Sequence, residues 1–185
     1  MTGAAFREGG RAWKLFNYGL LQAAWFGCVL GAAGGATWIA WASGALVLAV
    51  HFALVRDRRA DIVLVGAAVA FGLVTETISR GVRAYDVPGD PFPWPLAPSW
   101  IVLLWAVFAT TLRHCMAWMR GRLVVAALFG AVGGPLSLSG GAKLGAVEIS
   151  ADPLLFWGVV GAQWALAMPV LVRLAARVSA SASRP

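Results

Sequence analysis

The sequence predicts an all-α membrane protein, a polytopic bundle of six transmembrane helices with both termini in the cytoplasm. Three observations lead to this fold class. Hydrophobic residues make up 60% of the 185 residues and charged residues only 12%, whereas a soluble domain carries about 25% charged residues. Six apolar runs fill the chain, and the basic residues fall almost entirely into alternate gaps between them. The length allows one compact unit and no separate soluble domain.

Each apolar run is long enough for a spanning helix, which needs about 20 residues to cross a hydrocarbon core of roughly 30 Å. In chain order, the predicted spans are 15–33, 36–55, 61–80, 99–119, 123–141 and 153–173. Residues 1–14 and 174–185 are then cytoplasmic segments on either side of a transmembrane domain at 15–173.

The connections between the runs differ in length and character. Gly34 and Gly35 form a connection so short that the first two helices are predicted to be a tight antiparallel pair. Residues 56–59 form a short charged connection, and the proline-rich residues 87–95 form a longer one.

Small residues indicate where helices approach closely. Gly27, Gly31 and Gly35 repeat every four positions along one face of the first helix, a spacing that lets helix backbones pack together. This face can meet a neighbour in the bundle or a second protomer, so a homo-oligomer contact is one of two predictions. The Gly-Gly-Pro sequence at 133–135 predicts a kink or a break in the fifth helix, because proline removes a backbone donor.

The distribution of Lys and Arg predicts the orientation, because short loops rich in these residues stay cytoplasmic. One side receives Arg80, Arg83 and Lys143, and the other receives Arg7, Arg11, Lys14, Arg56, Arg58, Arg59, Arg120, Arg122, Arg173, Arg177 and Arg184. The pattern is typical of a multi-pass protein of the bacterial inner membrane. The pI of 10.7 then reflects charge at helix ends rather than a basic face, which argues against a nucleic-acid partner.

The candidate functional residues are polar and aromatic side chains inside the predicted spans, where a charge at the helix centre costs about 2.5–3.5 kcal/mol. By depth, they form an inner layer, an outer layer and a group near the middle. The inner layer contains Asn17, His51, Arg113 and His114; the outer layer contains Glu76, Ser137, Ser139 and Lys143; the middle contains Gln22, Gln163, Trp25, Trp105 and Trp164. Helices that enclose these groups predict a cavity with polar head contacts and apolar walls.

Each candidate also has a structural interpretation. Arg113 can extend toward the cytoplasmic headgroups. Glu76 can pair with Arg80, one turn away, or be neutral. The two histidines can each satisfy a neighbouring carbonyl, the serines can cap carbonyls freed by the proline, and the tryptophans can be core residues.

Common catalytic and cofactor-binding motifs are missing from the chain. It has no His-Glu-x-x-His, cysteine cluster, Gly-x-Ser-x-Gly, phosphate loop or dinucleotide fingerprint. Two histidines are too few for a di-iron site. The sequence therefore predicts no cofactor and no metal, and it disfavours an independent redox enzyme.

Three stretches of the chain resemble the domain-of-unknown-function family numbered 2878, an uncharacterised family of small bacterial integral membrane proteins. They are Asn17 with QAAWFGCVLG at 22–31, Leu-Trp at 104–105 with FATTLRH at 108–114, and GPLS at 134–137 leading to LGA at 144–146. The family more often has Asn-His-Ser at the position of residues 113–115, and Asp at the position of Glu76.

The resemblance implies an integral membrane protein without an agreed activity. Family members are often encoded near genes similar to cyclopropane-fatty-acid synthases, which points toward membrane-lipid modification. A lipid-modifying enzyme is thus an implied partner, in addition to membrane lipids.

Four functions are consistent with the sequence. The first is binding or presenting a lipid, with the acyl or isoprenoid chain among the tryptophans and the polar head at Arg113, His114 or Glu76. The second is a small transporter or flippase with Glu76 as a proton-sensitive group. The third is a metal-free intramembrane lipid-modifying enzyme, and the fourth is a structural partner that docks through the glycine face of the first helix.

Overall fold

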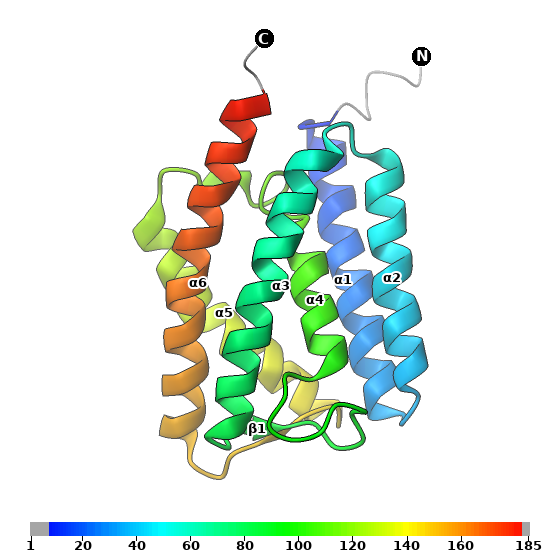
Figure 1. Cartoon of the computed structure of the whole chain (residues 1–185), viewed down its shortest axis with the longest axis vertical. Coiled ribbons are helices and arrows are strands. Elements are labelled where there is room, and N and C mark those ends of the chain that lie inside the picture. The colour runs from blue at the N-terminus through cyan, green and yellow to red at the C-terminus, as the bar shows by residue number, and fades with distance from the viewer. Residues whose placement is uncertain (1–7, 183–185) are drawn as a thin grey trace.

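The computed structural model describes residues 8–182, which form six α-helices and one short β-ladder (Figure 1). The helices are α1 (Arg11–Ala33), α2 (Thr37–Leu54), α3 (Arg58–Gly81), α4 (Ser99–Ala109), α5 (Leu123–Lys143) and α6 (Pro153–Ala182), with the 3-10 helix η1 at Ala117–Met119. Strands β1 (Tyr85–Asp86) and β2 (Glu148–Ile149) pair antiparallel. The predicted all-α class is confirmed, with this two-residue ladder as an addition.

Five of the helices, all except α4, are long and apolar enough to cross a membrane. Large hydrophobic side chains such as Leu154, Val124 and Leu166 lie exposed on the outside of the bundle. This outward hydrophobicity is what contact with lipid requires. The chain is therefore a multi-pass membrane protein. That the segment containing α4 also spans the membrane, and that both termini are cytoplasmic, stay predictions.

Figure 1 shows α1 and α2 at one side of the bundle, α5 and α6 at the other, and α3 and α4 between them. The start of α1 and the end of α6 lie at the same end, and β1 lies at the opposite end. We call these the inner end and the outer end, after the predicted orientation. Helix α1 packs mainly on α2, α5 mainly on α6, and α3 on both α4 and α6.

The fourth predicted span, 99–119, is helical only in its first half, so the prediction of a full helix was wrong. After α4, the backbone continues in turns, and the hydroxyls of Thr110 and Thr111 donate to the carbonyls three residues earlier at 2.7 and 2.6 Å. Such local bonds compete with the α-helical pattern. As a result, Arg113 and His114 lie on an irregular segment rather than on a helix.

The fifth helix continues through Pro135, so the predicted break does not occur. Its glycines instead make room for α6. A Cβ at Gly130 would collide with the backbone carbonyl of Trp164, and a Cβ at Gly134 would collide with the Trp164 ring. The small residues of α5 therefore serve helix packing, as small residues commonly do in membrane bundles.

The glycine face of α1 meets α2 of the same chain. A Cβ at Gly27 would collide with Ser43, and a Cβ at Gly31 would lie 2.7 Å from the Ala40 amide nitrogen. Gly35 lies in the connecting turn with φ +70°, a conformation that favours glycine. Of the two predicted neighbours, the structure shows the one in the bundle, and the homo-oligomer contact stays a prediction.

The first and last helices extend beyond the predicted spans. Helix α1 begins at Arg11, and α6 continues to Ala182, so most of the predicted C-terminal segment 174–185 is helical. Arg7 and Arg184, which contributed to the predicted orientation, lie outside the described residues.

Candidate functional site

An apolar cavity of about 540 Å³ lies inside the bundle, within the roughly 300–1,000 Å³ range of small-molecule sites. Helices α1, α3, α4, α5 and α6 all contribute to its walls. Its aromatic lining consists of Tyr18, Trp25, Trp100, Trp105, Phe108, Phe129 and Trp164. Of all lining residues, only Glu76 carries a carboxylate.

The Glu76 carboxylate is buried and accepts a hydrogen bond at each oxygen. Trp105 Nε1 donates to Oε1 at 2.8 Å, and the Tyr85 hydroxyl donates to Oε2 at 2.5 Å. Burial, followed by the negative charge of Glu76, raises the pKa of Tyr85 well above its ordinary value. Tyr85 therefore stays protonated and remains a donor to Glu76.

The predicted alternative in which Glu76 pairs with Arg80 was wrong. Arg80 instead directs Nε and NH2 to one oxygen of Asp86, at 2.9 and 2.7 Å. Its NH1 donates to the backbone carbonyl of Leu96. These bonds attach the end of α3 to the connection at residues 82–98, which lies at the outer end. They leave Glu76 without an ion-pair partner among residues 8–182.

The cavity wall is an ordered set of aromatic rings. Trp105 and Trp164 stack with centroids 4.1 Å apart, and Phe108 meets Trp164 edge-on at 5.3 Å. Glycine makes this stack possible, because a Cβ at Gly72 would lie 2.6 Å from the Trp105 ring. Such ring pairs contribute about 0.5–1.5 kcal/mol beyond their burial.

Six of the predicted site residues line this cavity: Gln22, Trp25, Glu76, Trp105, Ser137 and Trp164. Trp25 Nε1 donates to Ser137 Oγ at 2.9 Å and joins α1 to α5 across the cavity. Ser137 is therefore not simply a cap for carbonyls near the proline. Gln163 is not part of the wall, and its Oε1 accepts from Ser79 at 2.6 Å.

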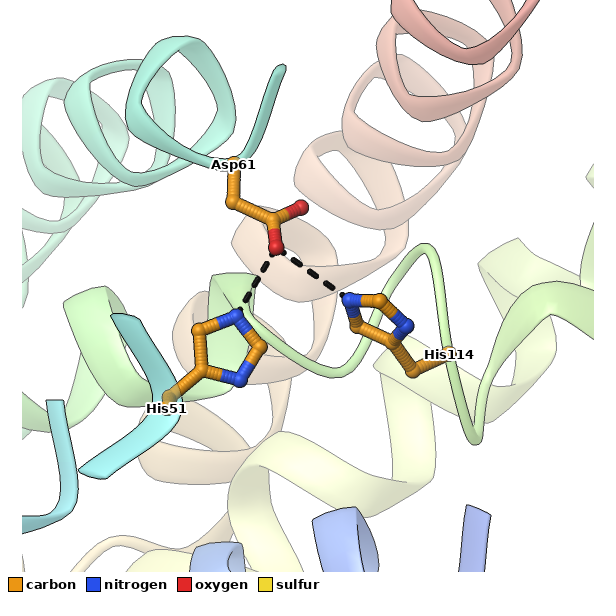
Figure 2. A group of neighbouring side chains, drawn as sticks. All are labelled: His51, Asp61 and His114. Carbon is orange, nitrogen blue, oxygen red and sulfur yellow. Dashed lines mark hydrogen bonds and ion pairs between the residues drawn. The ribbon is translucent and has the colours of Figure 1, made fainter. Parts of the chain in front are cut away.

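A second polar cluster lies near the inner end, where His51 of α2, Asp61 of α3 and His114 meet (Figure 2). Asp61 Oδ2 lies 2.8 Å from His51 Nε2 and 3.2 Å from His114 Nε2. All three side chains are buried. The predicted alternative, in which each histidine satisfies a carbonyl, was wrong because both imidazoles contact the same carboxylate.

Arg113 completes this inner cluster. Its NH1 donates to Asp61 Oδ1 at 2.9 Å, and its NH2 donates to Asp57 Oδ2 at 2.8 Å. The Arg113 side chain is only 10% exposed, so the predicted extension toward headgroups was wrong. Asn17 lies beside the cluster, where it donates to the Thr110 carbonyl at 3.2 Å and helps to hold the irregular segment after α4.

His51, Asp61 and His114 each place one possible metal-ligand atom within 4.8 Å of the other two, a spacing at which three side chains can hold a metal ion. However, Trp13 Nε1 donates to His114 Nδ1 at 2.9 Å, and an indole N–H can only donate. His114 must therefore carry its proton on Nε2, which leaves that nitrogen no lone pair for a metal. The Arg113 guanidinium on Asp61 also repels a cation, so the donor set does not fit a metal site.

Three residues of these clusters were not among the predicted site residues. Asp61 appeared only as the start of a predicted span, although a short connection places the end of α2 and the start of α3, and thus His51 and Asp61, at similar depth. Trp13 had the pattern of an interfacial anchor. Tyr85 lay in a predicted loop, where no sequence signal indicated contact with Glu76.

The geometry thus consists of an aromatic cavity with one carboxylate and a separate ion-paired cluster toward the inner end. Neither curated proteins nor solved structures give a match to this chain. The model of a family described as protein of unknown function (DUF2878) matches residues 14–170, which include all predicted site residues and every residue of the two clusters except Trp13. The chain therefore belongs to the DUF2878 family of proteins of unknown function.

Proposed function

We propose that this protein binds an amphiphilic lipid, with the acyl or isoprenoid chain in the aromatic cavity and the polar group at Glu76. The observation that carries the proposal is an apolar cavity of about 540 Å³ whose walls contain a single carboxylate. Arg113 and His114, the other predicted head contacts, are engaged with Asp61 and do not line this cavity.

Side chains that both line the cavity and lie exposed supply a route of entry. Tyr18 on α1 is 51% exposed, and Phe129 and Leu136 on α5 are 42% and 55% exposed. The cavity therefore reaches the outer surface of the bundle between α1 and α5. A lipid tail entering there passes directly from the bilayer into the site, without crossing water. Such a protein presents its lipid to a modifying enzyme in the same membrane.

A cavity-filling variant tests this proposal. Gly133 lines the cavity, and a Cβ there would contact only the Phe129 ring at 3.8 and 3.9 Å, an ordinary packing distance. Leucine at this position occupies part of the cavity and narrows it. Gly66→Leu is the matched control, because Gly66 lies exposed on α3 with nothing within 4 Å of a Cβ.

Mass spectrometry of lipids that copurify with each variant supplies the measurement. Wild type and Gly66→Leu should carry the same lipid species, enriched over the bulk membrane, and Gly133→Leu should lose it. An equal lipid profile in all three proteins, or no enrichment in wild type, would contradict lipid binding in the cavity.

Transport or lipid flipping is the second candidate, and one observation favours it. Glu76 lies in the last part of α3, toward the outer end, whereas Asp61 at the start of α3 and His51 at the end of α2 lie near the inner end, so buried ionisable side chains occur at two depths. A flippase activity in proteoliposomes should respond to a proton gradient and should be absent in Glu76→Gln. Transport that is independent of the gradient and unchanged in this variant would exclude the mechanism.

A further inference from the structure

Among residues 8–182, the Glu76 carboxylate has no positively charged partner. Its two hydrogen bonds come from Trp105 and Tyr85, which are neutral donors. The nearest basic residue along α3, Arg80, is engaged with Asp86 and a backbone carbonyl. An ionised group within a membrane span is costly, and such residues commonly serve as counter-ions to a ligand.

The inner cluster offers a contrast within the same chain. There, Asp61 is paired directly with Arg113 at 2.9 Å and so already has its cation. Glu76 has none among residues 8–182, and it faces a cavity instead. The difference indicates that Glu76 is paired by a group that enters the cavity.

The cavity walls favour the same chemistry. Ring faces attract cations, most strongly those of tryptophan, with about 2 kcal/mol or more at desolvated sites. Trp105 lines the cavity but meets Glu76 through its N–H edge and stacks one face on Trp164, so the ring faces available to a cation belong to other indoles of the cavity. Trp25, Trp100 and Trp164 supply further indole rings. An ionised Glu76 would repel an anionic headgroup, and a neutral ligand would supply no cation to it.

We infer that the ligand of this cavity carries a cationic nitrogen, an amine or a quaternary ammonium attached to an apolar body. The inference rests on the proposed function and specifies its ligand class. The positive nitrogen lies against the Glu76 carboxylate, and the apolar part occupies the remaining volume among the aromatic rings.

Three probes with the same chain and different head charges test this assignment: dodecyltrimethylammonium, dodecanol and dodecanoate. Each is titrated calorimetrically into the full-length protein in a non-ionic detergent, and heats from empty micelles are subtracted. Wild type should bind the ammonium probe roughly tenfold or more tighter than the alcohol, and the carboxylate probe should bind most weakly.

Glu76→Gln should remove this preference, because it keeps the size and an acceptor oxygen but removes the charge. The alcohol should bind this variant as it binds wild type. Glu148→Gln is the matched control, since Glu148 lies exposed on β2 outside the cavity, and it should retain the ammonium preference.

The outcomes separate the inference from the proposed function. Equal binding of ammonium and alcohol by wild type overturns the inference without reference to any variant, and so does tightest binding of dodecanoate. A preference that persists in a folded Glu76→Gln also overturns it. In each of these cases, lipid binding by the cavity still stands. If wild type binds none of the three probes, the proposed function fails, and the inference fails with it.

Discussion

Replacing Asp61 with asparagine should destabilise the bundle by about 3–5 kcal/mol, the cost of breaking a buried ion pair. The Asp61 carboxylate is fully buried and accepts from His51 and His114 at one oxygen and from Arg113 at the other. Asparagine replaces one of these acceptor oxygens with an amide group that donates. Whichever way the amide turns, at least one buried donor loses its acceptor.

Asp57→Asn provides the scale for comparison. Asp57 also pairs with Arg113, at 2.8 Å, but its side chain is 30% exposed. Exposed ion pairs contribute about 0.2–1 kcal/mol, so this variant should cost no more than about 1 kcal/mol. Both substitutions remove one negative charge next to the same arginine. Asp61 is fully buried and also accepts from two histidines, whereas Asp57 also accepts from the Ala60 amide as the N-cap of α3, a role that asparagine can keep.

Unfolding of the purified protein in mixed micelles, titrated with a denaturing detergent and followed by circular dichroism, measures both free energies. The double variant Asp61→Asn/Arg113→Gln should cost less than the sum of its single variants, because each single change leaves the other group unpaired. Equal costs for Asp61→Asn and Asp57→Asn, together with additive single variants at Asp61 and Arg113, would refute the structural account of the inner cluster.

Two further predictions concern packing and acid sensitivity. Gly134→Ala should destabilise by about 1–3 kcal/mol, because its Cβ collides with the Trp164 ring, whereas Gly133→Ala should be nearly neutral; equal melting temperatures of the two variants would contradict this. Burial alone would raise the pKa of Asp86, but a hydrogen bond from a backbone N–H and the Arg80 guanidinium hold this pKa below its ordinary value. The ionised Asp86 therefore stabilises the fold above about pH 4, and this stabilisation is lost as the pH falls through the folded-state pKa. Asp86→Asn should therefore have a lower melting temperature than wild type near neutral pH and approach wild type in acid, and a gap that is constant down to acid pH would argue against this ion pair.

The lengths of the apolar runs in the sequence predicted the helix positions correctly where a helix crosses the bundle without interruption. Spans predicted at 36–55 and 123–141 agree with α2 and α5 to within two residues, because their limits are set by polar or glycine-rich connections. The fourth helix did not follow, since residues 110–116 continue the run that begins at residue 99 but form turns. The hydroxyl bonds of Thr110 and Thr111 contribute to these turns, and hydropathy does not report such local competition.

The site could be predicted by depth but not by direction. Placing a charged or polar side chain inside the membrane costs free energy, and this made Glu76, Arg113 and both histidines stand out in the sequence. All of them lie in or beside the two polar clusters. Depth along a helix does not specify which way a side chain points around its axis. Arg113 therefore remained open to a headgroup contact, although the turns after α4 direct it to Asp61.

The two buried acids of α3 should separate function from stability. Asp61 is surrounded by hydrogen-bond donors and a cation and has no part in the cavity wall, so its charge serves the fold. Glu76 has two neutral donors and faces the cavity; Glu76→Gln keeps one acceptor oxygen and leaves one of these donors without an acceptor, so it should cost about 1–3 kcal/mol. Measured together, Glu76→Gln should change ligand preference with a smaller loss of unfolding free energy than Asp61→Asn, and Asp61→Asn should leave ligand preference unchanged. If Asp61→Asn altered ligand preference at unchanged stability, the inner cluster rather than the cavity carboxylate would be the place to look for the function.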